Sequence, residues 1–166
     1  MKRILFYLTI GLQCLFLIGL AVSFYLIDYF GETIKLETLP VDPQDIFYGD
    51  YVTLRYQIEE IPDAKWDAEK DPEYGETIYV LLEKGTESNY QVAKASSEKM
   101  GTTNEQVIMK AKVDYYDSTT KVHYVDYGLG RYYIEDNTGG KFEQSGQMSV
   151  TVAIAPWGQK KIVGIE

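Results

Sequence analysis

Residues 107–114, Val-Ile-Met-Lys-Ala-Lys-Val-Asp, decide how most of this chain folds. Four apolar side chains alternate there with four others: Val107, Met109, Ala111 and Val113 share one face, and Ile108, Lys110, Lys112 and Asp114 share the other. Successive side chains of a strand point to opposite faces, so this spacing predicts a strand that is buried on one side only. One-sided burial is typical of antiparallel sheets that pack on each other or close into a barrel.

The same alternation recurs outward in both directions, in short runs bounded by Gly, Pro, Asn and Asp. We expect strands at Thr33–Leu39, Tyr51–Ile58, Thr77–Glu83, Tyr90–Ala95, Gln106–Tyr115, Lys121–Tyr127, Arg131–Glu135, Ser149–Ala155 and Lys160–Ile165. Helical periodicity is hard to find among them. The predicted fold class is therefore all-β, an antiparallel sandwich or barrel.

The sequence also indicates the form of two connections between these strands. Ala155-Pro156-Trp157-Gly158 has the Pro and Gly of a tight turn, which predicts a hairpin between the last two strands. Residues 59–75 are rich in Glu, Asp and Pro around Trp66, and we expect a long surface loop there, with one turn of helix around Asp63 to Lys70.

The start of the chain is a long apolar stretch and not an alternating pattern. Residues 4–27, ILFYLTIGLQCLFLIGLAVSFYLI, contain no charged side chain, and about 20 apolar residues are enough for a helix to cross a bilayer. Lys2 and Arg3 precede this run, and Asp28 and Glu32 follow it, so the positive-inside rule places the N-terminus in the cytoplasm. We expect residues 1–30 to be a cytoplasmic N-terminus and single-pass transmembrane anchor in the cell membrane, and residues 31–166 to be an extracytoplasmic β-rich domain.

A cleaved signal peptide is the alternative for this segment. Ala21-Val22-Ser23 offers small residues at the positions that a signal peptidase reads. The apolar run is longer than the 7–15 residues of a signal-peptide core, however, and it continues past that point to Ile27. This length favours an uncleaved anchor.

Charge limits the partners of the domain. The whole chain carries −9, and residues 1–30 contribute +1 (Lys2 and Arg3 against Asp28), which leaves −10 on the rest. Such a domain repels phosphate backbones and anionic headgroups, so nucleic-acid binding and adhesion to the membrane surface through basic patches are disfavoured. Cationic or neutral partners remain possible. Besides the membrane that the helix crosses, we expect the partner to be an envelope protein or a cell-wall component.

A motif leads into the predicted second strand. Residues 49–56 read Gly-Asp-Tyr-Val-Thr-Leu-Arg-Tyr after an extended, proline-containing approach with Asp42 and Asp45. The motif resembles the pattern that names the GDYXXLXY family of bacterial membrane-anchored proteins, and residues 130–135, Gly-Arg-Tyr-Tyr-Ile-Glu, are similar to a second block of that family. The resemblance implies a short extracytoplasmic domain on a membrane anchor, without a known activity.

The candidate binding residues come from these two blocks. They are Asp42, Asp45, Gly49, Asp50, Tyr51, Leu54, Arg55, Tyr56, Arg131 and Tyr132. Two interpretations are open. The motif can be a structural corner of the sheet, with a turn at Gly49 and Asp50 and core side chains at Leu54 and Tyr56. Alternatively, the corner can bind a ligand or partner, with Arg55 binding a carboxylate or phosphate.

The inventory of reactive side chains argues against an enzyme. A signal-peptidase-like framework also begins a strand with Gly-Asp-x-Val, but residues 42–48 contain no serine or threonine nucleophile. The only cysteine, Cys14, lies in the apolar run, and a zinc site of several His or Cys ligands is excluded because His123 is the only histidine. We expect His123 to be a lone surface or edge residue. No acidic cluster matches a calcium loop, so we expect no cofactor.

Tyrosine is the other conspicuous residue type. Six tyrosines crowd into residues 115–133: Tyr115, Tyr116, Tyr124, Tyr127, Tyr132 and Tyr133. Strand propensity explains such a group, and an exposed sheet of tyrosines could also stack on a partner. The sequence thus predicts a non-catalytic interaction or binding module of the cell envelope. The alternative is a small-ligand-binding or hydrolytic domain that uses the corner from Asp42 to Arg55.

Overall fold

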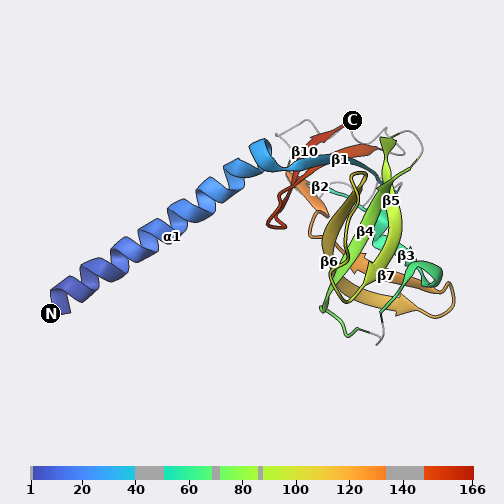
Figure 1. The fold of residues 1–166 in the computed structure, drawn as a ribbon, viewed down its shortest axis with the longest axis horizontal. Helices are drawn as coiled ribbons and strands as arrows, with labels where there is room; N and C mark the ends of the chain where they lie inside the picture. The colour runs from blue at the N-terminus through green and yellow to red at the C-terminus, as the bar shows by residue number, and fades with distance from the viewer. Residues whose placement is uncertain (1, 40–50, 69–71, 86–87, 134–147) are drawn as a thin grey trace.

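The computed structural model describes residues 2–39, 51–68, 72–85, 88–133 and 148–166, and it shows one long helix followed by a β domain (Figure 1). The helix, α1, runs from Lys2 to Phe30. The strands are β1 (Glu32–Glu37), β2 (Tyr51–Thr53), β3 (Glu60–Pro62), β4 (Thr77–Lys84), β5 (Tyr90–Ser96), β6 (Gln106–Asp117), β7 (Val122–Asp126), β8 (Arg131–Tyr133), β9 (Ser149–Ile154) and β10 (Lys160–Ile165).

The strands form a nearly closed barrel. The largest sheet has the order β3-β7-β6-β4-β5, a second has β1-β9-β10, and β2 pairs with β8. All these pairings are antiparallel. A parallel bridge from Lys35 to Asn89 brings β1 to the edge of the large sheet beside β5, and the Asn89 amide donates to Glu37 Oε1 at 2.7 Å. The predicted all-β class is confirmed, and the barrel alternative describes the sheet best.

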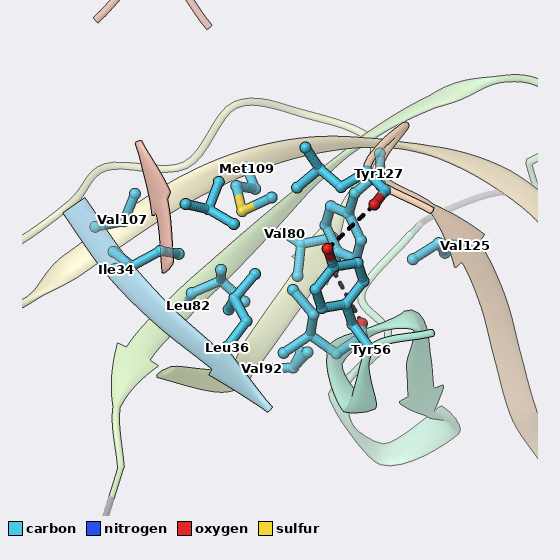
Figure 2. Close-up of a cluster of buried hydrophobic side chains, with 14 of the residues drawn as sticks. Ile34, Leu36, Tyr56, Val80, Leu82, Val92, Val107, Met109, Val125 and Tyr127 are labelled. Atoms are coloured by element: carbon cyan, nitrogen blue, oxygen red, sulfur yellow. Dashed lines mark hydrogen bonds between the residues drawn. The ribbon is translucent and has the colours of Figure 1, made fainter. Parts of the chain in front are cut away.

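The core follows the predicted alternation. Val107, Met109, Ala111 and Val113 of β6 are all buried, and so are Val150, Val152 and Ile154 of β9. Together with Ile34 and Leu36 of β1 they fill the space between the sheets, as Figure 2 shows for one cluster of these side chains. A fully buried side chain of this kind stabilises the fold by about 1.5–3 kcal/mol. The hairpin between β9 and β10 is also confirmed, with the Gly158 N–H donating to the Ala155 carbonyl at 2.8 Å.

The predicted strand at Tyr51–Ile58 is wrong in its second half. Strand β2 ends at Thr53, and Gln57–Glu59 form a 3-10 turn. The cause is the side chain of Glu59, which accepts the Tyr56 N–H at 3.1 Å, while the Glu59 N–H donates to the Tyr56 carbonyl. These two bonds take the backbone groups of Tyr56 that a longer strand would need for its ladder. Alternation nevertheless persists, because Leu54, Tyr56 and Ile58 are buried while Arg55 and Gln57 are exposed.

The predicted long loop at residues 59–75 is also corrected. It contains the short strand β3, which pairs with β7 at the edge of the large sheet, where Pro62 needs no ladder donor. The expected turn of helix is a 3-10 turn limited to Asp63–Lys65. Residues 69–71 lie outside the described part of the chain.

His123 lies in the interior of the fold and not at the surface. Only 6% of it is exposed, and its ring stacks on Trp66 with centroids 3.9 Å apart and lies 4.4 Å from the ring of Tyr116. Its Nε2 lies 3.1 Å from Asp63 Oδ1. The reason is that β3, which the alternation does not predict, and the 3-10 turn after it place Asp63 and Trp66 over β7. His123 is therefore a packed residue of this small aromatic cluster.

Helix α1 enters the barrel without a linker. It is long and apolar enough to cross a membrane, and almost none of its apolar stretch is buried within the structure. At its end Ile27 packs on Ala153 and Ala155 of the β9 region, and the Gly31 N–H donates to the Ile27 carbonyl at 2.8 Å. Strand β1 begins at Glu32, one residue later. The helix and the barrel are thus joined by direct contacts at this end.

Candidate functional site

Two buried tyrosines hold the motif corner in place. The Tyr56 hydroxyl donates to the Leu129 carbonyl at 3.1 Å, and the Tyr127 hydroxyl donates to the Ile58 carbonyl at 3.0 Å. Each ring therefore bonds the segment that carries the other, and Figure 2 shows both side chains in the core. Burial raises the pKa of both hydroxyls, so they remain protonated donors. This reciprocal pair fixes residues 54–59 against residues 127–130.

Arg55 lies in the sequence between the buried residues Leu54 and Tyr56, and its side chain is exposed. It is exposed at the rim of a hollow of about 210 Å³, the corner pocket, which is lined by Leu39, Arg55, Glu59, Glu60, Asp114, Tyr115, Tyr124, Val125 and Asp126. Its backbone carbonyl accepts the Leu39 N–H at 2.8 Å, and the Leu54 N–H donates to the Gly130 carbonyl at 2.9 Å. These bonds position the Arg55 side chain beside β6 and β7.

A β-bulge supplies the aromatic wall of the corner pocket. Val113 pairs with Val125, but Tyr115 pairs with Tyr124, so Asp114 is the extra residue on β6. The bulge breaks the alternation and leaves both Asp114 and Tyr115 on the exposed side. The rings of Tyr115 and Tyr124 then stack with centroids 4.4 Å apart. The tyrosine group noted in the sequence and the motif corner thus meet at one place.

Glu59 is the electrostatic centre of the corner pocket. Burial, and to a lesser degree the nearby carboxylates Asp126 and Glu60, raise its pKa to about 7, against the opposing effects of the Tyr56 N–H bond and Arg55. The Glu59 carboxyl therefore titrates nearer to neutral pH than an ordinary glutamate does. Four carboxyl groups face one guanidinium here, so the pocket is acidic with an aromatic wall.

The predicted site residues are distributed between core, pocket and undescribed segments. Asp42, Asp45, Gly49 and Asp50 lie outside the described residues. Leu54 and Tyr56 are core side chains, and Arg55 is at the corner pocket. The two sequence blocks are brought together, because β2 pairs with β8: Tyr51 stands opposite Tyr133, Val52 opposite Tyr132, and Thr53 opposite Arg131. Tyr132 packs partly against the core, and Arg131 is exposed.

Sequence reasoning missed the acidic half of the pocket. Glu59 and Glu60 fall in the predicted loop at residues 59–75, and Asp114 and Asp126 are not among the predicted binding residues. The only signal for them was their place beside Tyr115 and Tyr124, because the bulge that gathers them is a tertiary feature.

The pocket suits recognition of a positively charged group. Carboxylates accept hydrogen bonds from an ammonium or guanidinium, and the face of a stacked tyrosine attracts a cation. Among the described residues, no group of three or more His, Cys, Asp or Glu side chains is arranged to hold a metal ion.

Comparison with known proteins adds the family. A family model described as GDYXXLXY protein matches residues 13–165, from the middle of α1 to the end of β10. The chain belongs to the GDYXXLXY family. No curated protein and no solved structure matches it significantly. The letters of the GDYXXLXY name fall on Gly49, Asp50, Tyr51, Leu54 and Tyr56, and the last two are packed in the core. At these two positions the name describes residues that build the corner.

Proposed function

We propose that this GDYXXLXY protein is a single-pass membrane protein whose β domain lies outside the cytoplasm and binds a cationic group of an envelope partner in the corner pocket. The domain is a non-catalytic module in this proposal. The observation that carries it is the corner pocket itself, where Arg55 of the motif, the stacked Tyr115 and Tyr124 and four carboxyl groups meet.

The orientation rests on the two ends of α1. Lys2 and Arg3 stand before the apolar stretch, and Asp28 and Glu32 stand after it. Basic flanks stay in the cytoplasm, so the barrel is on the far side. A cysteine at Asn104, in a Cys14→Ser background, is then labelled by a membrane-impermeant maleimide in intact cells. Labelling only after lysis would reverse the orientation.

The charge of the pocket selects the partner. A lysine or arginine side chain, or an amine on a wall polymer, donates hydrogen bonds to Asp114, Asp126 and Glu60 and makes a cation–π contact with the Tyr115–Tyr124 pair. Arg55 at the rim repels a second cation and so favours a single charged group over a polycation. The strongly acidic domain also attracts such partners at longer range.

A photo-crosslinker in the pocket tests the binding proposal. Benzoylphenylalanine replaces Tyr115 in the full-length protein in its native membrane, and the matched control places it at Tyr74, which is exposed and outside the pocket. We expect an adduct from position 115 that is absent from position 74 and weakened at least fivefold by Asp114→Asn with Asp126→Asn. Equal adducts from both positions, or none from position 115, contradict the proposal.

A further inference from the structure

A second and larger hollow lies where α1 meets the barrel. This membrane-proximal pocket has a volume of about 540 Å³, and its lining includes Phe30, Glu32, Lys99, Lys110, Trp157 and Lys160. It shares no lining residue with the corner pocket. Phe30 is the last residue of α1. If α1 crosses a membrane, this hollow therefore opens at the membrane surface.

Contacts between the β9–β10 hairpin and α1 show that the pocket lies beside the last turns of the helix. Lys161 of β10 bonds both carboxylate oxygens of Asp28 at 2.9 Å, and its Nζ lies 4.7 Å from the centre of the Phe24 ring. Phe24 is six residues before the end of α1, or about 9 Å along the helix axis. The hairpin thus runs back beside the last turns of α1, as Figure 1 shows for the red strands near the end of the blue helix.

The tip of this hairpin carries an exposed tryptophan. Trp157 is 45% exposed, and its indole N–H donates to Gln159 Oε1 at 2.7 Å. Tyr29 and Phe30 are exposed at the end of α1. Tryptophan and tyrosine gather at membrane interfaces, where an apolar ring and a polar edge are both satisfied. Trp157 is therefore placed to enter the headgroup layer beside the helix.

The pocket is locally basic although the domain is acidic. Lys99, Lys110 and Lys160 face a single carboxylate, Glu32, in its lining. Lys160 is fixed, because its Nζ donates to the Lys110 and Tyr127 carbonyls at 2.6 Å. The Lys110 Nζ lies over the Tyr79 ring, 5.9 Å from its centre, and its side chain passes close to Gly158. Net charge alone disfavours adhesion to anionic headgroups, but the charged side chains that line this pocket are mostly basic.

We propose that the membrane-proximal pocket binds the headgroup of an anionic phospholipid in the leaflet that the barrel faces. The phosphate lies against Lys99 and Lys110, and the glycerol and upper acyl carbons lie against Phe30 and Trp157. This inference rests on the proposed membrane anchoring of α1. A surface lysine near anionic lipid contributes about fivefold in affinity, so the two lysines together contribute about 25-fold.

Native mass spectrometry of the full-length protein released from nanodiscs tests this site. The nanodiscs contain equal amounts of phosphatidylglycerol and phosphatidylcholine. We expect wild-type protein to retain phosphatidylglycerol in preference to phosphatidylcholine, and Lys99→Gln with Lys110→Gln to lower that preference at least tenfold. The matched control is Lys84→Gln with Lys121→Gln, which changes the charge equally at exposed positions outside the pocket.

Three results would overturn the lipid site. The first is equal retention of both lipids, or an equal loss of preference in the control variant. The second is complete competition by 10 mM inorganic phosphate, which shows a site for a free anion. The third is a protein that does not float with vesicles of phosphatidylcholine alone, which removes the anchoring as well. Flotation without lipid preference leaves the anchoring intact and rejects only the headgroup site.

Discussion

Tyr56 shows how one side chain of the motif serves the fold. Its ring is fully buried, and its hydroxyl donates to the Leu129 carbonyl. Tyr56→Phe keeps the ring but leaves that carbonyl without this donor, so we expect the free energy of unfolding to fall by about 1–2 kcal/mol. Denaturant unfolding of the full-length protein in detergent, followed by tryptophan fluorescence, measures the change. Tyr74→Phe at an exposed position is the control, and equal midpoints for both variants contradict the role of this bond.

Glu59 makes stability depend on pH. Its folded-state pKa of about 7 lies above the ordinary value of 4.5, so the native protein holds a proton that the unfolded chain releases. The stability that this proton provides is present below about pH 4.5 and is lost as the pH rises to about 7. Glu59→Gln keeps an acceptor for the Tyr56 N–H and removes the ionisation. We expect the variant to be more stable than wild type by about 2–3 kcal/mol at pH 8 and similar at pH 4.

Unfolding midpoints between pH 4 and pH 8 measure this effect. Glu98→Gln, at an exposed position, should leave the pH profile of the wild type unchanged. A Glu59→Gln profile that runs parallel to the wild-type profile contradicts a buried, protonated Glu59.

At the scale of elements, the junction between α1 and β1 depends on a glycine. A Cβ added at Gly31 would lie 2.4 Å from the Ile27 carbonyl oxygen, closer than real contacts allow. Gly31→Ala therefore disrupts the hydrogen bond from the residue 31 N–H to the Ile27 carbonyl at the helix end, and we expect amide hydrogen exchange at positions 31 and 32 to quicken about tenfold or more. Gly19→Ala, which meets nothing within 4 Å, is the control and should leave exchange at the junction unchanged. Slow exchange in both variants contradicts the tight junction.

The sequence predicted the long elements because each had a repeated period. Strands β4, β5, β6, β9 and β10 lie within one or two residues of their predicted ranges. The failures have local causes that a period does not show. At Tyr56 a glutamate three residues later competes for the backbone, and at β3 three residues ending in Pro62 are too short to alternate visibly.

The contrast between sequence patterns and tertiary contacts also explains which residues of the candidate site could be predicted. Arg55 is a predicted site residue because it belongs to a motif. Tyr115 and Tyr124 belong to a tyrosine group that strand propensity also explains. Glu59 and Asp126 join them only through the bulge at Asp114 and the 3-10 turn at Gln57–Glu59. His123 was placed at the surface because Asp63 and Trp66, its contacts, are 60 and 57 residues away in the chain.

At the scale of the whole molecule, α1 is docked on the barrel, and we expect the two to move together. Ile27 packs on Ala153 and Ala155, and Lys161 pairs with Asp28. A nine-residue Gly/Ser linker inserted between Gly31 and Glu32 removes this docking but no pairing within the barrel. We expect the melting temperature of the barrel to change little.

A distance measurement detects the loss of docking. Spin labels at Cys14 in α1 and at a cysteine replacing the exposed Asn104 should give a narrow distance distribution in nanodiscs for the direct junction. The inserted linker should broaden it. An equally broad distribution without the linker contradicts rigid docking.

The direct entry of α1 into β1 also has a mechanical consequence. Strand β1 pairs antiparallel with β9 over six residues, Glu32–Glu37, and these hydrogen bonds run across the strand axis. Tension applied through α1 along β1 therefore loads the whole ladder in shear, and the bonds must break together instead of one after another. If α1 anchors the protein in a membrane as proposed, a pull on the helix is resisted by the β1–β9 ladder that directly follows it.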